Sequence, residues 1–188
     1  MLKKSSVFWP ILLLILLIAL IALAFYLFKP TVLEPNDFAK LVSNFDECVA
    51  LGNPILESYP AQCLTPDGRT FVQDIGNELE KMDLIKINSP RPNQVVSSPL
   101  RIEGFARGYW FFEADFPVKL YDADNNLIAS GIAQAQGEWM TEDFVPFVAN
   151  LEFEKPLAEK GNLILEKDNP SGLPEHDDYL RVPLFFNN

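Results

Sequence analysis

The chain has 188 residues, and its 15 Lys and Arg against 26 Asp and Glu give a net charge of −11. Three of the basic residues lie at or before Lys29, so the rest of the chain, with 12 basic and 26 acidic residues, carries −14. Such a surface repels phosphate backbones, which excludes nucleic acid as an expected partner. The part after Lys29 is long enough for one domain, or for one domain plus a small appendage.

The N-terminal region holds an uninterrupted apolar run. Val7 to Phe28 are 22 consecutive residues without a charge. As a helix they would cover about 33 Å, against about 30 Å for the hydrocarbon core of a bilayer. A cleaved signal peptide is the alternative, and Ala22-Leu23-Ala24 has the form of a cleavage site. The apolar run continues past that point, so we favour an uncleaved signal anchor.

The flanking charges set the expected orientation of this anchor. Lys3 and Lys4 precede the run, while Lys29 is followed by the acidic Glu34 and Asp37. The positive-inside bias therefore places the N-terminus in the cytoplasm and the body outside. We expect residues 1–29 to form a cytoplasmic tip and a single transmembrane helix in the cytoplasmic membrane.

Residues 30–75 are expected to form a small segment that contains both cysteines. Residues 30–35 read as a spacer, and Asn36 can cap a helix over about 37–51 whose apolar residues recur at three- and four-residue spacing. Gly52 suits the residue after the helix end. Pro66-Asp67-Gly68 then predicts a tight turn between two short extended stretches.

Cys48 falls in the last turn of that helix, and Cys63 follows 15 residues later. Outside the cytoplasm, two cysteines are most simply joined in a disulfide. Closing a loop of about 15 residues in this way stabilises the fold by roughly 3 kcal/mol. A reactive thiol is the alternative, but such thiols need a nearby His or cation, and His176 is the one histidine. Two Cys and one distant His also lack zinc-ligand spacing. We predict a disulfide, and no metal or other cofactor.

Residues 76–83 are polar and are interpreted as a linker to a C-terminal domain over residues 84–188. From Leu84 onward apolar and polar residues alternate over about seven short segments, and no helical period of useful length interrupts them. This pattern is typical of an antiparallel β-sandwich of the immunoglobulin type. The expected strands include 84–87, 100–103, 116–121, 127–135, 146–153, 162–167 and 179–186.

This domain also resembles a known family. The run INSPRPNQVVSSPLRIEGFARGYWFFEADFPVKLYDADNNLIASGIAQAQGEWM and the end GNLILEKDNPSGLPEHDDYLRVP are similar to the immunoglobulin-like domain of bacterial spore germination proteins. The resemblance covers about residues 84–184 and includes the SPLRIEG strand, the FE-x-x-F strand and the DNPSG loop. It implies an extracytoplasmic, non-catalytic interaction or scaffold domain. That domain often stands beside a GerM domain, which is absent here, so a germination role does not carry over.

The candidate binding residues are aromatic. Tyr109, Trp110 and Phe111 follow one another, and alternation along a strand would put them on both faces of a sheet. With Trp139 they form either an exposed patch that binds a partner or part of a thick core. The acidic loop 168–178 is the next candidate, as a calcium site or as an ordinary solvated turn.

The function expected from the sequence is non-catalytic binding in the bacterial cell envelope. The partner would be another envelope protein or a cell-wall polymer. A structural accessory subunit of a membrane or cell-wall complex is the alternative. A cell-wall-active enzyme is less expected, because no nucleophile and base stand at a useful spacing.

Overall fold

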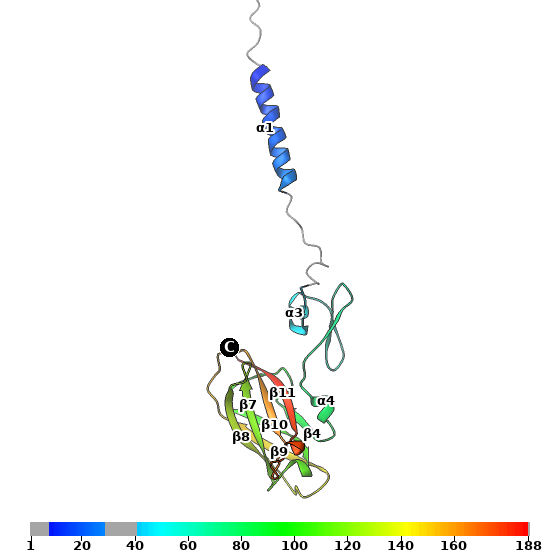
Figure 1. Cartoon of the computed structure of the whole chain (residues 1–188), viewed down its shortest axis with the longest axis vertical. Helices are drawn as coiled ribbons and strands as arrows, with labels where there is room; N and C mark the ends of the chain where they lie inside the picture. The colour runs from blue at the N-terminus through cyan, green and yellow to red at the C-terminus, as the bar shows by residue number, and fades with distance from the viewer. Residues whose placement is uncertain (1–7, 29–40, 188) are drawn as a thin grey trace, which may run out of the picture.

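The computed structural model describes residues 8–28 and 41–187 of the chain. Its described parts are a long helix, a small segment around α3 and a larger β-rich body (Figure 1). The spacer over 30–35, the expected cap Asn36 and the first residues of the helix predicted over 37–51 lie outside the described residues.

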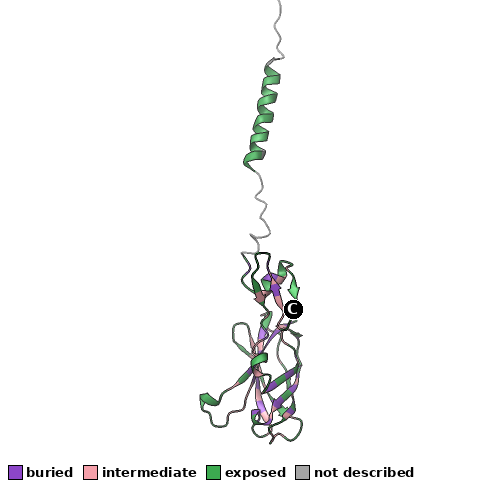
Figure 2. Ribbon diagram, turned by 90° about the vertical axis from the view of Figure 1, so that its right-hand side faces the viewer, coloured by how far each residue is buried: buried purple, intermediate pink, exposed green. Residues whose placement is uncertain are grey.

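The first helix, α1, spans Phe8–Leu27. The leucine and isoleucine side chains along it are at least half exposed, and Figure 2 colours the helix as exposed. Across residues 8–28 and 41–187, no helix is both long enough and apolar enough to span a membrane. The transmembrane anchor expected from Val7–Phe28 therefore stays a prediction.

Helix α3 spans Phe45–Ala50 and is shorter than the helix predicted over 37–51. Residues 41–44 are not helical, and Asn44 caps α3: its side chain accepts from the Glu47 N–H at 2.9 Å. The Glu47 carboxylate in turn accepts from the Ser43 N–H at 2.7 Å, so the two side chains satisfy free N–H groups at the helix start. The end is as predicted, with Gly52 at φ +75°.

Three short strands follow in an antiparallel sheet of order β1-β2-β3: Ile55–Leu56, Gln62–Leu64 and Thr70–Val72. The predicted turn joins β2 to β3, with Gly68 at φ +87°. The disulfide predicted between Cys48 and Cys63 is confirmed and links α3 to β2. Both cysteines are fully buried, and with Val42 they form a small core of their own.

The stretch predicted as a linker, residues 76–83, contains a one-turn helix, α4, at Glu78–Lys81. It packs against the sandwich rather than bridging open solvent. Gly76, at φ +75°, lies so close to strand β11 (Tyr179–Phe186) that a Cβ there would come within 1.8 Å of the Arg181 carbonyl oxygen. The Asn77 side chain accepts from the Arg181 N–H at 2.7 Å and donates to the Tyr179 carbonyl at 2.9 Å.

An ion pair completes this docking. The Asp74 carboxylate accepts two hydrogen bonds from the Arg181 guanidinium, at 2.7 and 3.0 Å. The hydrogen bonds from Arg181 hold the pKa of Asp74 below its ordinary value of 3.8. Residues 41–75, which hold the disulfide and are called the disulfide segment below, are thus tied to the sandwich by a group that is ionised at neutral pH.

Asp74→Asn is expected to lower the melting temperature of the full chain at pH 7. The pKa of Asp74 is lower in the folded state than in the unfolded state, where it is about 3.9. The ionised carboxylate therefore stabilises the fold at pH values above the unfolded-state pKa. This stabilisation is lost as the pH falls through the folded-state pKa. The difference between wild type and variant should therefore shrink below about pH 4. Thermal melts from pH 7 to pH 2 check this, with Asp124→Asn in an exposed turn as control. A difference that persists unchanged at pH 2 would contradict it.

The body is an eight-stranded curled sheet of order β4-β6-β9-β8-β7-β10-β11-β5. Its strands are Ile85–Ser89 (β4), Val95–Val96 (β5), Leu100–Arg107 (β6), Asp115–Asp122 (β7), Leu127–Ala135 (β8), Phe144–Leu151 (β9), Lys160–Glu166 (β10) and Tyr179–Phe186 (β11). One-turn 3₁₀ helices stand at Gly108–Trp110 (η1) and Pro174–His176 (η2). Strand β8 pairs along its length with β7 but with β9 only at Gln134 and Ala135, so the sheet folds over into a sandwich.

Alternation along the strands builds the core. In β6 every second residue from Leu100 to Ala106 is buried, and the residues between them are more exposed. The largest fully buried side chains include Trp110, Phe116 and Phe147. The Phe116 ring stands 5.2 Å from Phe111 and 5.0 Å from Phe147, centroid to centroid, which is the spacing of favourable aromatic pairs.

Candidate binding surface at the loop end of the sandwich

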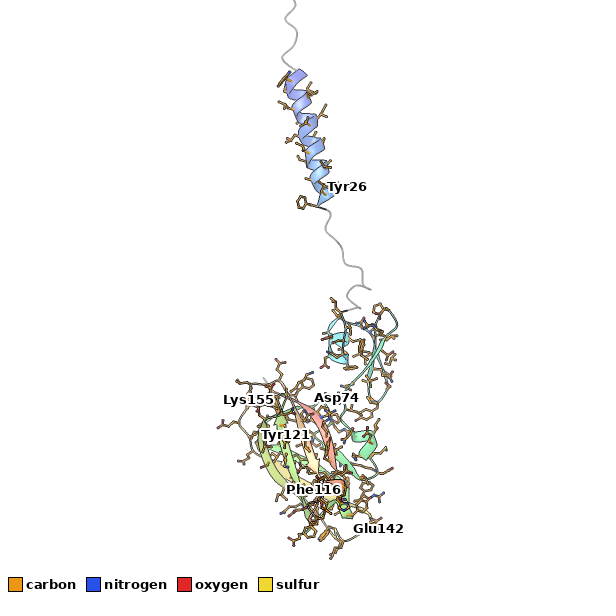
Figure 3. The ribbon with its side chains drawn as sticks, in the orientation of Figure 1. Tyr26, Asp74, Phe116, Tyr121, Glu142 and Lys155 are labelled. Atoms are coloured by element: carbon orange, nitrogen blue, oxygen red, sulfur yellow. A yellow bond between two sulfur atoms is a disulfide. The ribbon has the colours of Figure 1, made fainter. Side chains whose placement is uncertain are left out.

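Three loops meet at one end of the sandwich. They connect β6 to β7 (108–114), β8 to β9 (136–143) and β10 to β11 (167–178), and the antiparallel pairing brings all three to the same end. Two backbone hydrogen bonds tie them together: Gly108 N–H to the Asp143 carbonyl at 3.2 Å, and Asp168 N–H to the Trp110 carbonyl at 3.0 Å. We call this the loop end. Figure 3 labels Glu142 there, with Asp74 and Lys155 toward the opposite end.

Two of the four predicted binding residues are in the core. Trp110 is 0% exposed and Phe111 is 4% exposed, so neither side chain offers surface to a partner in this structure. The prediction that these aromatic residues supply a binding surface assumed an extended strand through 109–112, with one of its two faces outside the core. Instead η1 interrupts the strand there, and the alternation rule does not apply within a helical turn.

The other two lie nearer the surface. Tyr109 is 50% exposed, whereas Trp139 is half-buried and packs against the core. The structure adds two exposed apolar side chains, Phe112 at 42% and Met140 at 78%. We call Tyr109, Phe112 and Met140 the apolar tip. Their exposure could not be read from the sequence, because each stands next to an aromatic residue that is at least partly buried.

A tight turn sets the position of Phe112. Phe112 and Asp115 exchange two backbone hydrogen bonds, at 3.0 and 3.1 Å. The two residues between them, Glu113 and Ala114, have φ values of +51° and +70°. Turns with positive φ at both central residues usually have Asn or Gly there. Positive φ at Glu113 and Ala114 is therefore unfavourable and persists only because the surrounding structure holds it. Within the FE-x-x-F stretch, Phe112 to Ala114 therefore form a turn, and the strand that the resemblance implies begins at Asp115, the first residue of β7.

The loop end is strongly acidic. Its loops and the adjoining strand start carry Glu113, Asp115, Glu138, Glu142, Asp143, Asp168, Glu175, Asp177 and Asp178. Partial burial raises the pKa of Asp168, and the negative charges of Asp115 and Glu113 raise it further. Carboxylates crowded in this way favour an approaching cation over an anion.

The loop 168–178 is held by its own polar groups. The Asn169 side-chain amide donates to the Asp177 carboxylate at 2.7 Å and to the Leu173 carbonyl at 2.8 Å. Within the described parts of the chain, no group of three or more His, Cys, Asp or Glu is placed to hold a metal ion. These hydrogen bonds are those of a turn-rich loop. Both cysteine sulfurs are bonded to each other, so neither is a nucleophile here.

These observations define an immunoglobulin-like β-sandwich with a small disulfide segment docked on its side. Residues 84–172 match the family model Gmad2, described as the immunoglobulin-like domain of bacterial spore germination. The resemblance expected from the sequence is thus confirmed over those residues. Neither the curated proteins nor the solved structures that were compared with the chain gave a match.

Proposed function

We propose that this protein is a non-catalytic binding protein of the bacterial cell envelope, which engages a protein partner through the loop end. The observation that carries the proposal is the apolar tip, where Tyr109, Phe112 and Met140 stand exposed on loops that also carry many acidic residues. Exposed aromatic and methionine side chains on an otherwise polar surface are the usual anchors of protein interfaces. The domain family supports a binding or scaffold role.

The charge of the loop end points to the chemistry of the partner. The loops that bear the apolar tip are rich in carboxylates, and the chain after Lys29 carries −14 in total. A partner with a basic rim around an apolar pocket would match this surface and would be drawn to it by long-range attraction. An acidic polymer would be repelled, which favours an envelope protein over an anionic cell-wall polymer.

The location is part of the same proposal. The uncharged run Val7–Phe28, with Lys3 and Lys4 before it, would hold the protein in the cytoplasmic membrane with its body outside. The oxidised pair Cys48–Cys63 suits an extracytoplasmic compartment. In this arrangement the disulfide segment follows the anchor and its spacer in the chain, and the loop end lies at the far end of the sandwich from that segment (Figure 1).

Co-purification from membranes tests the proposal. Full-length protein should stay in carbonate-washed membranes, and mild detergent extraction should recover it with a partner. The triple variant Tyr109→Ala, Phe112→Ala, Met140→Ala should lose at least tenfold of that partner, because truncating a few interface anchors removes most of the binding energy. Its membrane retention and melting temperature should change little, since these side chains are exposed.

A matched control uses the similarly exposed Ile132 and Leu127 on β8, away from the apolar tip. The double variant Ile132→Ala, Leu127→Ala should retain the partner. Equal retention by the triple variant would refute the loop end as the binding surface. Release of the wild-type protein by the carbonate wash would refute the anchor.

A further inference from the structure

A polar groove lies between the disulfide segment and the sandwich. It has a volume of about 320 Å³, at the lower end of the range for small-ligand sites. One wall comes from the start of α3 and the end of β3, and the other from β10, β11 and the turn between β7 and β8. The two walls belong to separate cores, so the groove exists only because the segment is docked. It is distinct from the loop end.

The charged groups of this groove already satisfy one another. Arg181 is paired with Asp74, and Lys160 with Asp46. The Lys160 ammonium also stands 5.0 Å from the centre of the Phe185 ring. Two cations against two carboxylates leave the groove without net charge, so an ionic ligand finds no unpaired counter-charge there.

The polar groups of the groove that remain available to a ligand are side-chain amides. Gln73 makes no side-chain hydrogen bond to any described part of the chain, although it lines the groove and is only partly exposed. Asn162 accepts from Arg181 through Oδ1 at 3.0 Å, and its NH₂ group likewise has no partner among the described residues. An amide offers both donors and an acceptor, as a ligand hydroxyl does. Val72, 55% exposed, and Ala123 add apolar surface to the same walls.

We infer that this groove binds an uncharged, hydroxyl-rich ligand, namely a short stretch of neutral oligosaccharide. Ligand hydroxyls can both donate hydrogen bonds to the amide oxygens and accept them from the amide NH₂ groups. The faces of the sugar rings would lie on the apolar residues. An added peptide strand is a poorer fit for the sandwich wall, because β10 is paired on both sides and β11 lies between β10 and β5. The inference stands on the groove alone and does not depend on the loop end.

Titration calorimetry of the detergent-solubilised full chain tests it. The probe is the uncharged N-acetylglucosamine tetramer, and a galacturonic acid tetramer is the charged comparison. The neutral probe should bind with a measurable Kd, and the acidic one at least tenfold more weakly. Gln73→Ala should weaken binding about tenfold, the effect of losing one or two good hydrogen bonds. Ala123→Trp, which fills the groove from an exposed turn, should abolish it.

Gln134→Ala is the matched control, since Gln134 is an exposed glutamine on β8 outside the groove. It should bind the probe as the wild type does, and all three variants should keep the wild-type melting temperature. Three outcomes would each overturn the inference: no binding of the neutral tetramer at millimolar concentration, preference for the acidic tetramer, or binding that both groove variants leave unchanged.

Discussion

Trp110→Ala is expected to lower the free energy of unfolding by about 3–5 kcal/mol. Trp110 is among the largest fully buried side chains of the sandwich, so its truncation leaves a cavity that the neighbouring strands can only partly fill. Tyr109→Ala, in the same 3₁₀ turn but half exposed, should change that free energy by no more than about 0.5 kcal/mol. Urea unfolding of the full chain, followed by circular dichroism, measures both.

A third variant separates the volume of Trp110 from its polar atom. The indole N–H is buried, and it has no hydrogen-bond partner in the described structure. Because an unpaired buried donor is unfavourable, Trp110→Phe should cost clearly less than Trp110→Ala. If Trp110→Ala and Tyr109→Ala lowered the free energy of unfolding equally, Trp110 would lie outside the core and would again be a candidate binding residue.

Removing the disulfide is expected to have the second largest effect. The double variant Cys48→Ser, Cys63→Ser opens a loop of 15 residues, and closing such a loop contributes about 3 kcal/mol in the chain-entropy model. It also places two hydroxyls in a small core where both cysteines are fully buried. The segment around α3 should therefore unfold before the sandwich does.

Limited proteolysis combined with thermal melts checks this order. Cleavage of the double variant should fall first between residues 41 and 75, while the sandwich keeps a cooperative melt, because the two cores share no buried residue. Simultaneous loss of both parts would show instead that the sandwich depends on the segment. A wild-type protein that takes up two alkyl groups without reductant would contradict the disulfide itself.

The strands were the part of the fold that sequence reasoning predicted best. The segments at 127–135 and 179–186 have the predicted bounds, because each is a long alternating run between turn residues. Strand β5 was missed because it has two residues and exists only through its parallel pairing with β11. No local pattern can report a pairing between positions 95 and 185.

The site was harder to predict than the fold. The aromatic run 109–112 suggested a strand with two apolar faces, but η1 and the turn at Glu113–Ala114 decide which rings are buried. Positive φ at Glu and Ala goes against local preference, so tertiary contacts must hold it. The packing of residues 41–83 against the sandwich could also not be predicted from the sequence, because the paired residues Asp74 and Arg181 lie far apart in the chain.

Photo-crosslinking in living cells tests most directly the claim that the loop end is the binding surface. A photoreactive side chain would replace Met140 at the apolar tip, and in parallel strains Ile132 on β8 or Lys155, toward the opposite end of the sandwich (Figure 3). We expect one discrete protein adduct from position 140, its loss when Tyr109→Ala and Phe112→Ala are added, and no such adduct from positions 132 and 155. The same adduct from position 155 or 132, with none from 140, would contradict it.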